Sequence, residues 1–182
     1  YECDVNGTMT LSSMIAVAIK VSEEQSDQLE RGTDFVHGFG LTWIITNYQL
    51  FIMRLPQVGE TIRIATQAME YNKYFCYRNF WLTTESGEEL VRIETIFALM
   101  NLESRKMSSV PAEIIAPYES EKITKIKRYP KSEKVVAGDS LPFRVRFYDI
   151  DSNQHVNNAV YFNWMLDVLG YEFLTTMTPT YV

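Results

Sequence analysis

The segment that organises the first half of the chain reads LSSMIAVAIKVSEEQSDQL, from Leu11 to Leu29. Its stripe of regularly spaced side chains consists of Leu11, Met14, Ile15, Ala18, Val21, Gln25 and Leu29. The acidic residues of the segment lie off this stripe. Spacings of three and four predict an amphipathic helix, because such residues share one helix face. Gly32 is expected to end the helix.

Four strand-like runs follow, at residues 42–55, 61–69, 76–84 and 89–102. Period-two alternation predicts one shared face for Ile44, Tyr48, Leu50 and Ile52, and another for Val91, Ile93, Thr95, Phe97 and Leu99. Pro56 with Gly59 ends the first run, and the turn residues 85–88 predict a hairpin between the last two. We expect a four-strand antiparallel meander. A sheet that wraps one long helix is the α+β hotdog arrangement.

The chain changes character after residue 118. Residues 119–134 are rich in lysine and poor in large apolar groups, which is typical of a linker between domains. Alternation of Phe143, Val145 and Phe147 with polar residues then predicts a strand. A second amphipathic helix is expected from about Asn157, with its apolar side formed by Val160, Trp164, Met165, Val168 and Leu169.

A short internal repeat links the two halves. Asp4, Asn6 and Thr8 precede the first helix as Asp151, Asn153 and His155 precede the second. We therefore expect a tandem (double) hotdog in which the first copy lacks the histidine. The predicted division is an N-terminal hotdog at 1–117, a linker at 118–138, and the start of a C-terminal hotdog at 139–182 that is cut off after its helix.

Composition excludes several classes of protein. Of 182 residues, 17 are basic and 23 acidic, a net charge of −6 that argues against a general nucleic-acid binder. No apolar run is long enough for a membrane span, and no signal peptide is visible at Tyr1. The chain has 2 cysteines and 2 scattered histidines, with no Cys-x-x-Cys, phosphate loop or dinucleotide fingerprint. We expect no metal and no cofactor.

The polar segment YDIDSNQHVNN, from Tyr148 to Asn158, holds the candidate chemistry. It places the Asp151 carboxylate, the Asn153 amide and the His155 imidazole just before a helix start, whose free N–H groups suit a developing oxyanion. These are parts for acyl transfer. A polar turn with a helix-capping Asn157 or Asn158 explains only part of the cluster.

Other reactive side chains favour structural roles. His37, next to Gly38 and Phe39, is expected to be a loop or edge histidine with structural hydrogen bonds. Cys76, in the middle of a strand, is expected to be a small buried hydrophobe. No Gly-x-Ser-x-Gly elbow is present, which argues against an α/β-hydrolase. The nucleophile therefore stays open.

Several separated motifs resemble one family over nearly the entire chain. The pattern YDxDxNQHVNNxxY at 148–161 is similar to the signature of hotdog acyl–acyl-carrier-protein (acyl-ACP) thioesterases of plants and bacteria. The segments WIITNYQL at 43–50, LPxxGE at 55–60 and FxxMNxxxRKM at 97–107 are similar to strands and turns of that family's first domain.

The resemblance implies an enzyme that hydrolyses the thioester between a fatty acyl chain and the phosphopantetheine arm of ACP. Asp151, Asn153 and His155 match the family's catalytic residues, and Asn157 with nearby N–H groups matches the helix start that would hold the thioester oxygen. The family's remaining catalytic Cys or Glu is expected beyond Val182. The first domain would bind the acyl chain, with Met14, Ile15, Ala18 and Met53 as candidate lining residues.

The expected partner is ACP, which the lysine-rich linker could attract, although a merely solvated linker fits equally well. The expected compartment is the bacterial cytoplasm, or the plastid stroma in a plant. A homodimer is expected without being fixed by the sequence, and the acyl-chain length stays open. Two alternatives remain: an acyl-CoA thioesterase of the broader hotdog group, and a non-catalytic acyl-binding module.

Overall fold

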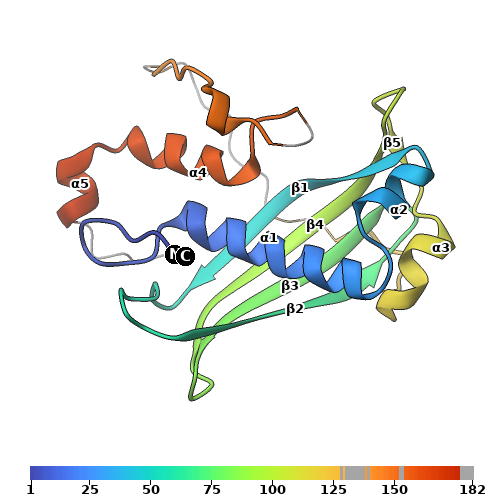
Figure 1. Ribbon diagram of the computed structural model, residues 1–182, viewed down its shortest axis with the longest axis horizontal. Coiled ribbons are helices and arrows are strands. Elements are labelled where there is room, and N and C mark those ends of the chain that lie inside the picture. The colour runs from blue at the N-terminus through green and yellow to red at the C-terminus, as the bar shows by residue number, and fades with distance from the viewer. Residues whose placement is uncertain (128, 130–137, 139, 152–153, 177–182) are drawn as a thin grey trace. The chain divides into compact units, whose positions relative to one another are not determined.

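The computed structural model describes residues 1–127, 129, 138, 140–151 and 154–176 (Figure 1). The chain forms two compact units. The sheet unit comprises the described residues of 18–54 and 61–129, and the terminal unit comprises those of 1–17, 55–60 and 130–180. Helix α1 (Leu11–Gln28) contributes residues to both.

Helix α1 confirms the predicted amphipathic helix. At its start, the Oγ1 atom of Thr10 accepts a hydrogen bond from the Ser13 amide at 3.2 Å, which caps the helix. At its end, Glu30 takes the left-handed conformation (φ 57°), and the Arg31 amide donates to the Ser26 carbonyl at 2.7 Å. This closing motif ends the helix before Gly32, so the expectation that Gly32 ends it is wrong. Gly32 instead precedes the short helix α2 (Thr33–Gly38).

The strands form one sheet in the order β1-β4-β3-β2-β6, with β5 beside β4 (Figure 1). Their bounds are β1 Leu41–Ile52, β2 Ile62–Tyr71, β3 Phe75–Thr84, β4 Glu89–Asn101, β5 Met107–Ser108 and β6 Glu121–Lys122. The predicted meander is correct for β2, β3 and β4 but wrong for β1, which pairs with β4. The long connection through Pro56 cannot make a tight hairpin, and β1 matches β4 in length.

A β-bulge at Thr46 changes which side chains of β1 share a face. Ile44 pairs with Ala98, whereas Tyr48 pairs with Thr95. The side chains of Ala98 and Thr95 lie on opposite faces of β4. The register shifts between Ile45 and Asn47, which leaves Thr46 as the extra residue. Tyr48, Leu50 and Ile52 therefore keep their predicted shared face, and the prediction is wrong for Ile44.

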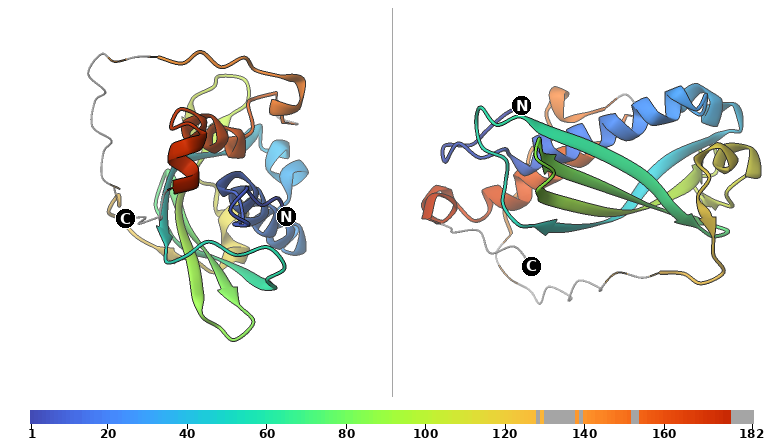
Figure 2. Two further views of the ribbon diagram at one scale, coloured as in Figure 1. Left: turned by 90° about the vertical axis from the view of Figure 1, so that its left-hand side faces the viewer. Right: turned by 90° about the horizontal axis from the view of Figure 1, so that it is seen from below.

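The core of the sheet unit lies on one face of the sheet. This face carries the fully buried side chains of Phe80, Leu82, Val91, Ile93 and Leu99. The Ala18–Gln28 half of α1 lies along the same face (Figures 1 and 2), where the Gln25 side chain accepts a hydrogen bond from Arg78 of β3. Helices α2 and α3 (Ala112–Ile115) close one end of the core through Val36, Leu41, Leu99 and Ile114.

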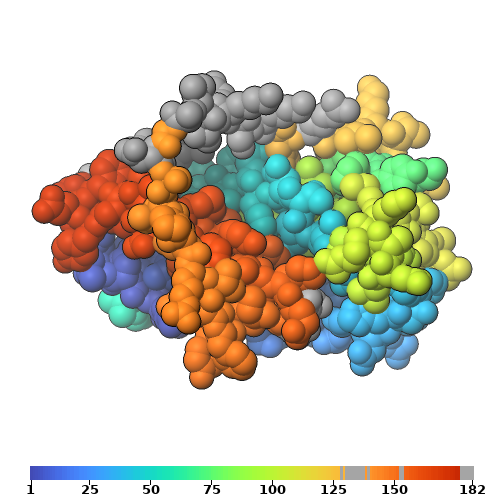
Figure 3. All heavy atoms as spheres, turned by 90° about the horizontal axis from the view of Figure 1, so that it is seen from above, coloured from blue at the N-terminus to red at the C-terminus, as the bar shows by residue number. Residues whose placement is uncertain are grey.

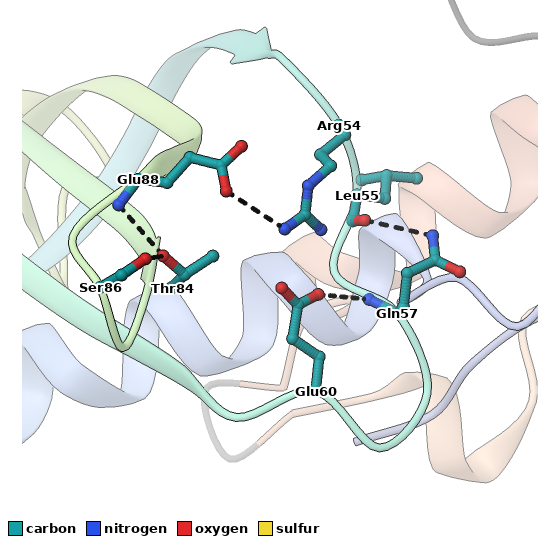
Figure 4. Close-up of polar contacts among 7 residues, drawn as sticks. All are labelled: Arg54, Leu55, Gln57, Glu60, Thr84, Ser86 and Glu88. Atoms are coloured by element: carbon teal, nitrogen blue, oxygen red, sulfur yellow. Dashed lines mark hydrogen bonds and ion pairs between the residues drawn. The ribbon is translucent and has the colours of Figure 1, made fainter.

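The hairpin between β3 and β4 confirms the predicted turn at 85–88. Gly87 takes a positive φ of 92°, and its amide donates to the Thr84 carbonyl at 3.1 Å. The Thr84 hydroxyl accepts from the Glu88 amide at 3.1 Å, and the Glu88 carboxylate pairs with Arg54 at 3.6 Å (Figure 4). The turn is therefore fixed by side chains as well as by the strands.

In the sheet unit, the start of the lysine-rich segment is tied to the sheet edge. Strand β6 pairs in parallel with β2, and the Ile123 amide donates to the Tyr71 carbonyl at 2.8 Å. Lys127 forms an ion pair with Glu70. Residues 128 and 130–137 of the predicted linker lie outside the described residues. The division at 117 and 138 stays a prediction.

The terminal unit joins the N-terminus to the segment 55–60. The Met9 amide donates to the Pro56 carbonyl at 2.8 Å, and the Val58 amide donates to the Gly7 carbonyl at 2.7 Å. Within the segment, the Gln57 amide donates to the Glu60 carboxylate at 2.9 Å (Figure 4). These contacts position the turn that precedes α1.

The C-terminal part of the terminal unit consists of η2 (Phe147–Asp149), α4 (Asn158–Asp167) and α5 (Tyr171–Thr176). Helix α4 confirms the second predicted helix. The strand predicted at 143–148 is wrong: among the described residues this segment has no strand partner, and a single strand cannot satisfy its backbone groups. It lies exposed at the surface (orange in Figure 3), where Tyr148 is 90% accessible.

Helix α4 does not bury all of its predicted apolar side. Met165 is 59% exposed, and so is Val168, which follows the end of the helix.

Among the described helices, none is both long and apolar enough to span a membrane.

Candidate active site

The candidate site is a tight loop directly before α4. The Asp151 amide donates to the His155 carbonyl at 2.8 Å, and the His155 amide donates back to the Asp151 carboxylate at 3.2 Å. Gln154, in the left-handed conformation at φ 62°, donates its amide to the Asp151 carbonyl at 3.0 Å. The loop therefore folds back on itself and holds Asp151 and His155 together. Asn153, the third predicted catalytic residue, lies outside the described residues.

Asn157 joins this loop to the helix. Its side-chain oxygen accepts a hydrogen bond from the Ala159 amide at 2.9 Å, which confirms it as the N-cap of α4. The backbone N–H groups of the first helical turn have no partner within the helix, and the helix dipole makes this end partly positive. A carbonyl oxygen that gains negative charge would be stabilised here, at the helix end that follows Asp151 and His155 in the chain.

A clamp of Arg146 and Asp149 closes the base of the loop. The Asp149 carboxylate accepts hydrogen bonds from the Arg146 amide at 2.8 Å and from its guanidinium at 3.0 Å. The side-chain hydrogen bond from Arg146 holds the pKa of Asp149 below its usual range. The Asp149 carbonyl in turn accepts from the Asn157 amide at 2.8 Å, so the two ends of the loop are tied together.

The predicted internal repeat is confirmed in three dimensions. In the N-terminal loop, the Asp4 amide donates to the Thr8 carbonyl at 2.8 Å, and the Thr8 amide donates to the Asp4 carboxylate at 3.1 Å. Gly7, at φ 73°, donates to the Asp4 carbonyl at 3.0 Å, as Gln154 does to Asp151. A β-bridge flanks each loop, and a capped helix follows each one.

Two family models match the chain: the acyl-ACP thioesterase N-terminal domain over residues 1–118, and the acyl-ACP thioesterase C-terminal domain over residues 132–182. The chain belongs to the acyl-ACP thioesterase family. One relative is the chloroplastic acyl-[acyl-carrier-protein] hydrolase FATB3 of Cuphea viscosissima, 31% identical over 97% of this chain and 46% of that relative. The chain spans about half, or less, of the length of the curated relatives it matches.

Solved structures show the fold of this chain. A candidate oleoyl thioesterase from Lactobacillus plantarum matches 96% of this chain and 70% of its own, with a TM-score of 0.92 and 40% identity. An acyl-ACP thioesterase from Bacteroides thetaiotaomicron matches 96% of this chain and 71% of its own, with a TM-score of 0.82 and 22% identity. These matches confirm the α+β hotdog fold class.

The candidate acyl-lining residues of this chain differ in exposure. Met14, Ile15 and Ala18 are at most 1% exposed on α1, as expected for residues that face an interior. Met53 follows the end of β1 and is 66% exposed. The three helix residues therefore suit contact with an apolar ligand better than Met53 does.

The remaining reactive side chains fit structural roles. Burial raises the pKa of the Cys76 thiol to about 12, opposed by the nearby Arg78 charge, so Cys76 carries almost no thiolate near neutral pH. His37 was expected in a loop or at an edge with structural hydrogen bonds, and this expectation is wrong: His37 lies in helix α2, and its Nε2 atom is enclosed with no hydrogen-bond partner in the described structure. The described residues contain no cluster of three or more His, Cys, Asp or Glu suited to a metal ion.

Sequence reasoning missed two features of the chain. The Arg146–Asp149 clamp lies in a segment whose alternation imitates a strand, although Asp149 belongs to the quoted motif. The other is Arg78, a charged side chain only 7% exposed on the helix-facing side of β3. A charged residue within a run rich in aromatic and β-branched residues is the signal that could have drawn attention to it.

Proposed function

We propose that the protein hydrolyses the thioester between a fatty acyl chain and the phosphopantetheine arm of ACP. Water adds to the thioester carbonyl, the carbon–sulfur bond breaks, and the products are a free fatty acid and the thiol of ACP. The observation that carries the proposal is the Asp151–His155 loop, folded onto itself at the N-terminus of α4 in a chain of this family. Release of the fatty acid would end chain elongation.

The proposed roles follow from the geometry of the loop. The thioester oxygen would lie at the N-terminus of α4, where the amides near Asn157 stabilise its developing charge. His155 would act as a base or would orient the attacking group, since imidazole exchanges protons near neutral pH. Asp151 would hold this network, and Asn153 would fix the histidine or the water. The nucleophile stays open between a cysteine and a carboxylate-activated water.

Further features are proposed for the rest of the chain. The first hotdog, residues 1–117, would bind the acyl chain through Met14, Ile15 and Ala18, and the part from 139 onward would be catalytic. ACP is the proposed partner; a homodimer stays a prediction. A bacterial cytoplasm or a plastid stroma is the proposed compartment, supported by bacterial matches and by relatives named as chloroplastic.

Fatty acid release from a mixed pool of acyl-ACP thioesters tests the proposal. The full-length protein that contains this sequence is compared with its His155→Ala variant. We expect release by the parent and a loss of at least about a hundredfold in the variant, because general acid–base catalysis contributes about that much. His37→Ala is the matched control, since it removes the chain's other histidine from helix α2 and should leave the rate unchanged.

Each outcome separates the alternatives. Release that His155→Ala does not slow would overturn the site assignment. Faster hydrolysis of the same acyl group on CoA than on ACP would favour the acyl-CoA thioesterase. Intact thioester persisting with the folded parent protein would favour the non-catalytic acyl-binding module.

A further inference from the structure

A buried carboxylate lies in the otherwise exposed segment that precedes the candidate loop. Asp149 is 2% exposed, whereas its neighbours Phe147 and Tyr148 are 85% and 90% exposed. The segment therefore turns two aromatic rings outward and an acid inward, which reverses the usual distribution of these residue types. Aspartate is rarely buried unless its oxygens have partners. The reason for this burial lies in what Asp149 binds.

Arg146 supplies partners for both oxygens of the Asp149 carboxylate. Its amide donates to Oδ2 at 2.8 Å, and its guanidinium donates to Oδ1 at 3.0 Å through Nη2. The Nε atom of the same guanidinium donates to Oδ2 at 3.2 Å. The Arg146 side chain is 72% exposed, so water screens the ion pair, and exposed pairs contribute little to the stability of a whole fold. A local role therefore accounts better for this pair.

The clamp reaches α4 through the backbone of Asp149. The Asp149 carbonyl accepts a hydrogen bond at 2.8 Å from the amide of Asn157, the N-cap of α4. This bond is the first of three antiparallel rungs that lead into the candidate loop: Asp149–Asn157, Ile150–Val156 and Asp151–His155. The clamp therefore fixes the rung at which the loop meets the helix.

A second contact holds the other end of the same segment against α4. The ring of Phe143 stacks on the ring of Trp164, with centroids 5.6 Å apart and an angle of 14° between the planes. Trp164 lies within α4. The segment from Phe143 to Asp149 is thus attached to the helix at two points, and the clamp controls the point beside the helix N-terminus.

The N-terminal loop contains the same three rungs without a clamp. The Thr10 amide donates to the Glu2 carbonyl at 3.1 Å, as the Asn157 amide does to the Asp149 carbonyl. Glu2, which takes the place of Asp149 in the repeat, is exposed and forms no ion pair within the described part of the chain. The backbone structure of the loop therefore forms without a charged pair.

Each loop also has a support outside its rungs, and the two supports differ in kind. The N-terminal loop is held by the backbone of residues 56–58, where the Met9 amide donates to the Pro56 carbonyl at 2.8 Å. The described residues around the loop before α4 provide the side-chain clamp in its place. The charged pair thus occurs in the copy that carries His155, which connects it with the chemistry.

We propose that Arg146 and Asp149 are positioning residues for thioester hydrolysis, and that their ion pair holds the N-terminus of α4 in register with Asp151 and His155. This inference rests on the proposed function. The amides that would stabilise the thioester oxygen belong to α4, whereas the imidazole belongs to the loop. The rate therefore depends on a fixed distance between the two. A misplacement of about 1 Å between such groups can slow a reaction about a hundredfold.

Arg146→Met tests the positioning role in the full-length protein. It keeps an unbranched side chain and removes the guanidinium. We measure kcat and KM for one acyl-ACP thioester. The expected result is a fall in kcat of at least about tenfold with KM within about twofold of the parent, because the clamp orients the reacting groups without binding the acyl chain. Arg146→Lys, which keeps the charge, should recover at least about a third of the parent kcat.

Arg144→Met is the matched control, because Arg144 is an exposed arginine of the same segment that has no ion pair within the described residues. It should leave both constants unchanged. Hydrogen exchange is the second readout: the Asn157 amide should exchange faster in Arg146→Met and at the parent rate in Arg144→Met. If Arg146→Met does not fold, as judged by circular dichroism and melting, Asp149→Asn gives the decision. It keeps an oxygen for the Arg146 amide, removes the charge, and should lower kcat in the same way.

An unchanged kcat in a folded Arg146→Met variant would overturn the positioning role and leave the proposed function intact. A raised KM with an unchanged kcat would also overturn it, and would indicate that Arg146 binds a negatively charged surface of ACP instead. An equal fall in kcat in Arg144→Met, or a fall without faster exchange at Asn157, would overturn it as well. No release of fatty acid by the parent protein would be a failure of the proposed function. The two kinds of failure are therefore distinguishable.

Discussion

Alkylation of the two cysteines tests whether Cys76 can be the nucleophile. Burial raises the pKa of Cys76 to about 12, so at pH 8 about one molecule in ten thousand carries the thiolate. An ordinary exposed cysteine, with a pKa of about 8.5, is about one quarter ionised at the same pH. Since the thiolate is the reactive form, Cys76 should react roughly two thousandfold more slowly than an ordinary thiol. Its 7% exposure adds steric protection.

The assay treats the folded protein with iodoacetamide at pH 8 and follows the two cysteine peptides by mass spectrometry. Cys3, which is exposed, is the internal control and should label quickly. In denaturant both peptides should label at similar rates. Cys76→Ala should leave thioester hydrolysis within about twofold of the parent. Labelling of Cys76 in the folded protein within tenfold of the rate of Cys3 would refute this reasoning.

Further predictions concern the two loops. Asn157→Ala removes the cap of α4 and should lower the stability of the helix start by about 1 kcal/mol. The measurement is hydrogen exchange of the amides in the first helical turn, which should become faster. Unchanged exchange rates would contradict the role of the cap. Gly7→Ala should lower the free energy of unfolding by about 1 kcal/mol, because Gly7 has a positive φ of 73°. Gln154→Gly should leave the free energy of unfolding almost unchanged, because glycine adopts the φ of 62° found at Gln154 without strain. Equal losses in the two variants would contradict the shared geometry of the loops. Arg146→Met should raise the lowered pKa of Asp149 towards about 4 in an NMR titration. In the parent protein, the clamp stabilises the loop fully at pH values above the ordinary aspartate pKa. This stabilisation is lost as the pH falls through the lowered pKa of Asp149. If the pKa of Asp149 is the same in Arg146→Met as in the parent, the clamp is contradicted.

The elements of the sheet unit were largely predictable because their signals are local. Helix α1 and the strands β2 to β4 follow from side-chain periodicity and from turn residues. The pairing of β1 with β4 was not predictable in this way, because it depends on contacts between distant parts of the chain. The bulge at Thr46 was also missed, since one extra residue reverses the alternation without any local mark.

The candidate site could be predicted in part, because its reactive residue types lie at a position where the sequence also repeats. Asp151 and His155 were singled out by their residue types before a helix start, and the structure brings them into one loop, while their catalytic roles stay a prediction. Arg146 was missed because its alternation with apolar neighbours imitates a strand, whereas it binds Asp149 three residues away. Arg78 was missed because β3 was read by its aromatic and β-branched content, and only the fold shows that this side chain faces the interior.

The two loops share one backbone structure, although only the second carries a histidine. Replacing one side chain in the first loop tests whether the backbone structure depends on that side chain. The backbone bonds between Asp4 and Thr8 do not use the threonine hydroxyl, whose own bond to Asp4 is an exposed contact of 2.8 Å. Thr8→His should therefore keep the loop and lower the unfolding free energy by about 1 kcal/mol or less.

This substitution should nevertheless not restore hydrolysis in a His155→Ala background. Asn6 occupies the place of Asn153, but its side chain donates to the Leu174 carbonyl at 3.3 Å and is engaged in holding α5. The thioester release assay on the double variant, with circular dichroism to confirm folding, measures this directly. Recovery of more than about a tenth of the parent rate would show that the N-terminal loop needs only an imidazole to become catalytic, and the role given to Asn6 would be wrong.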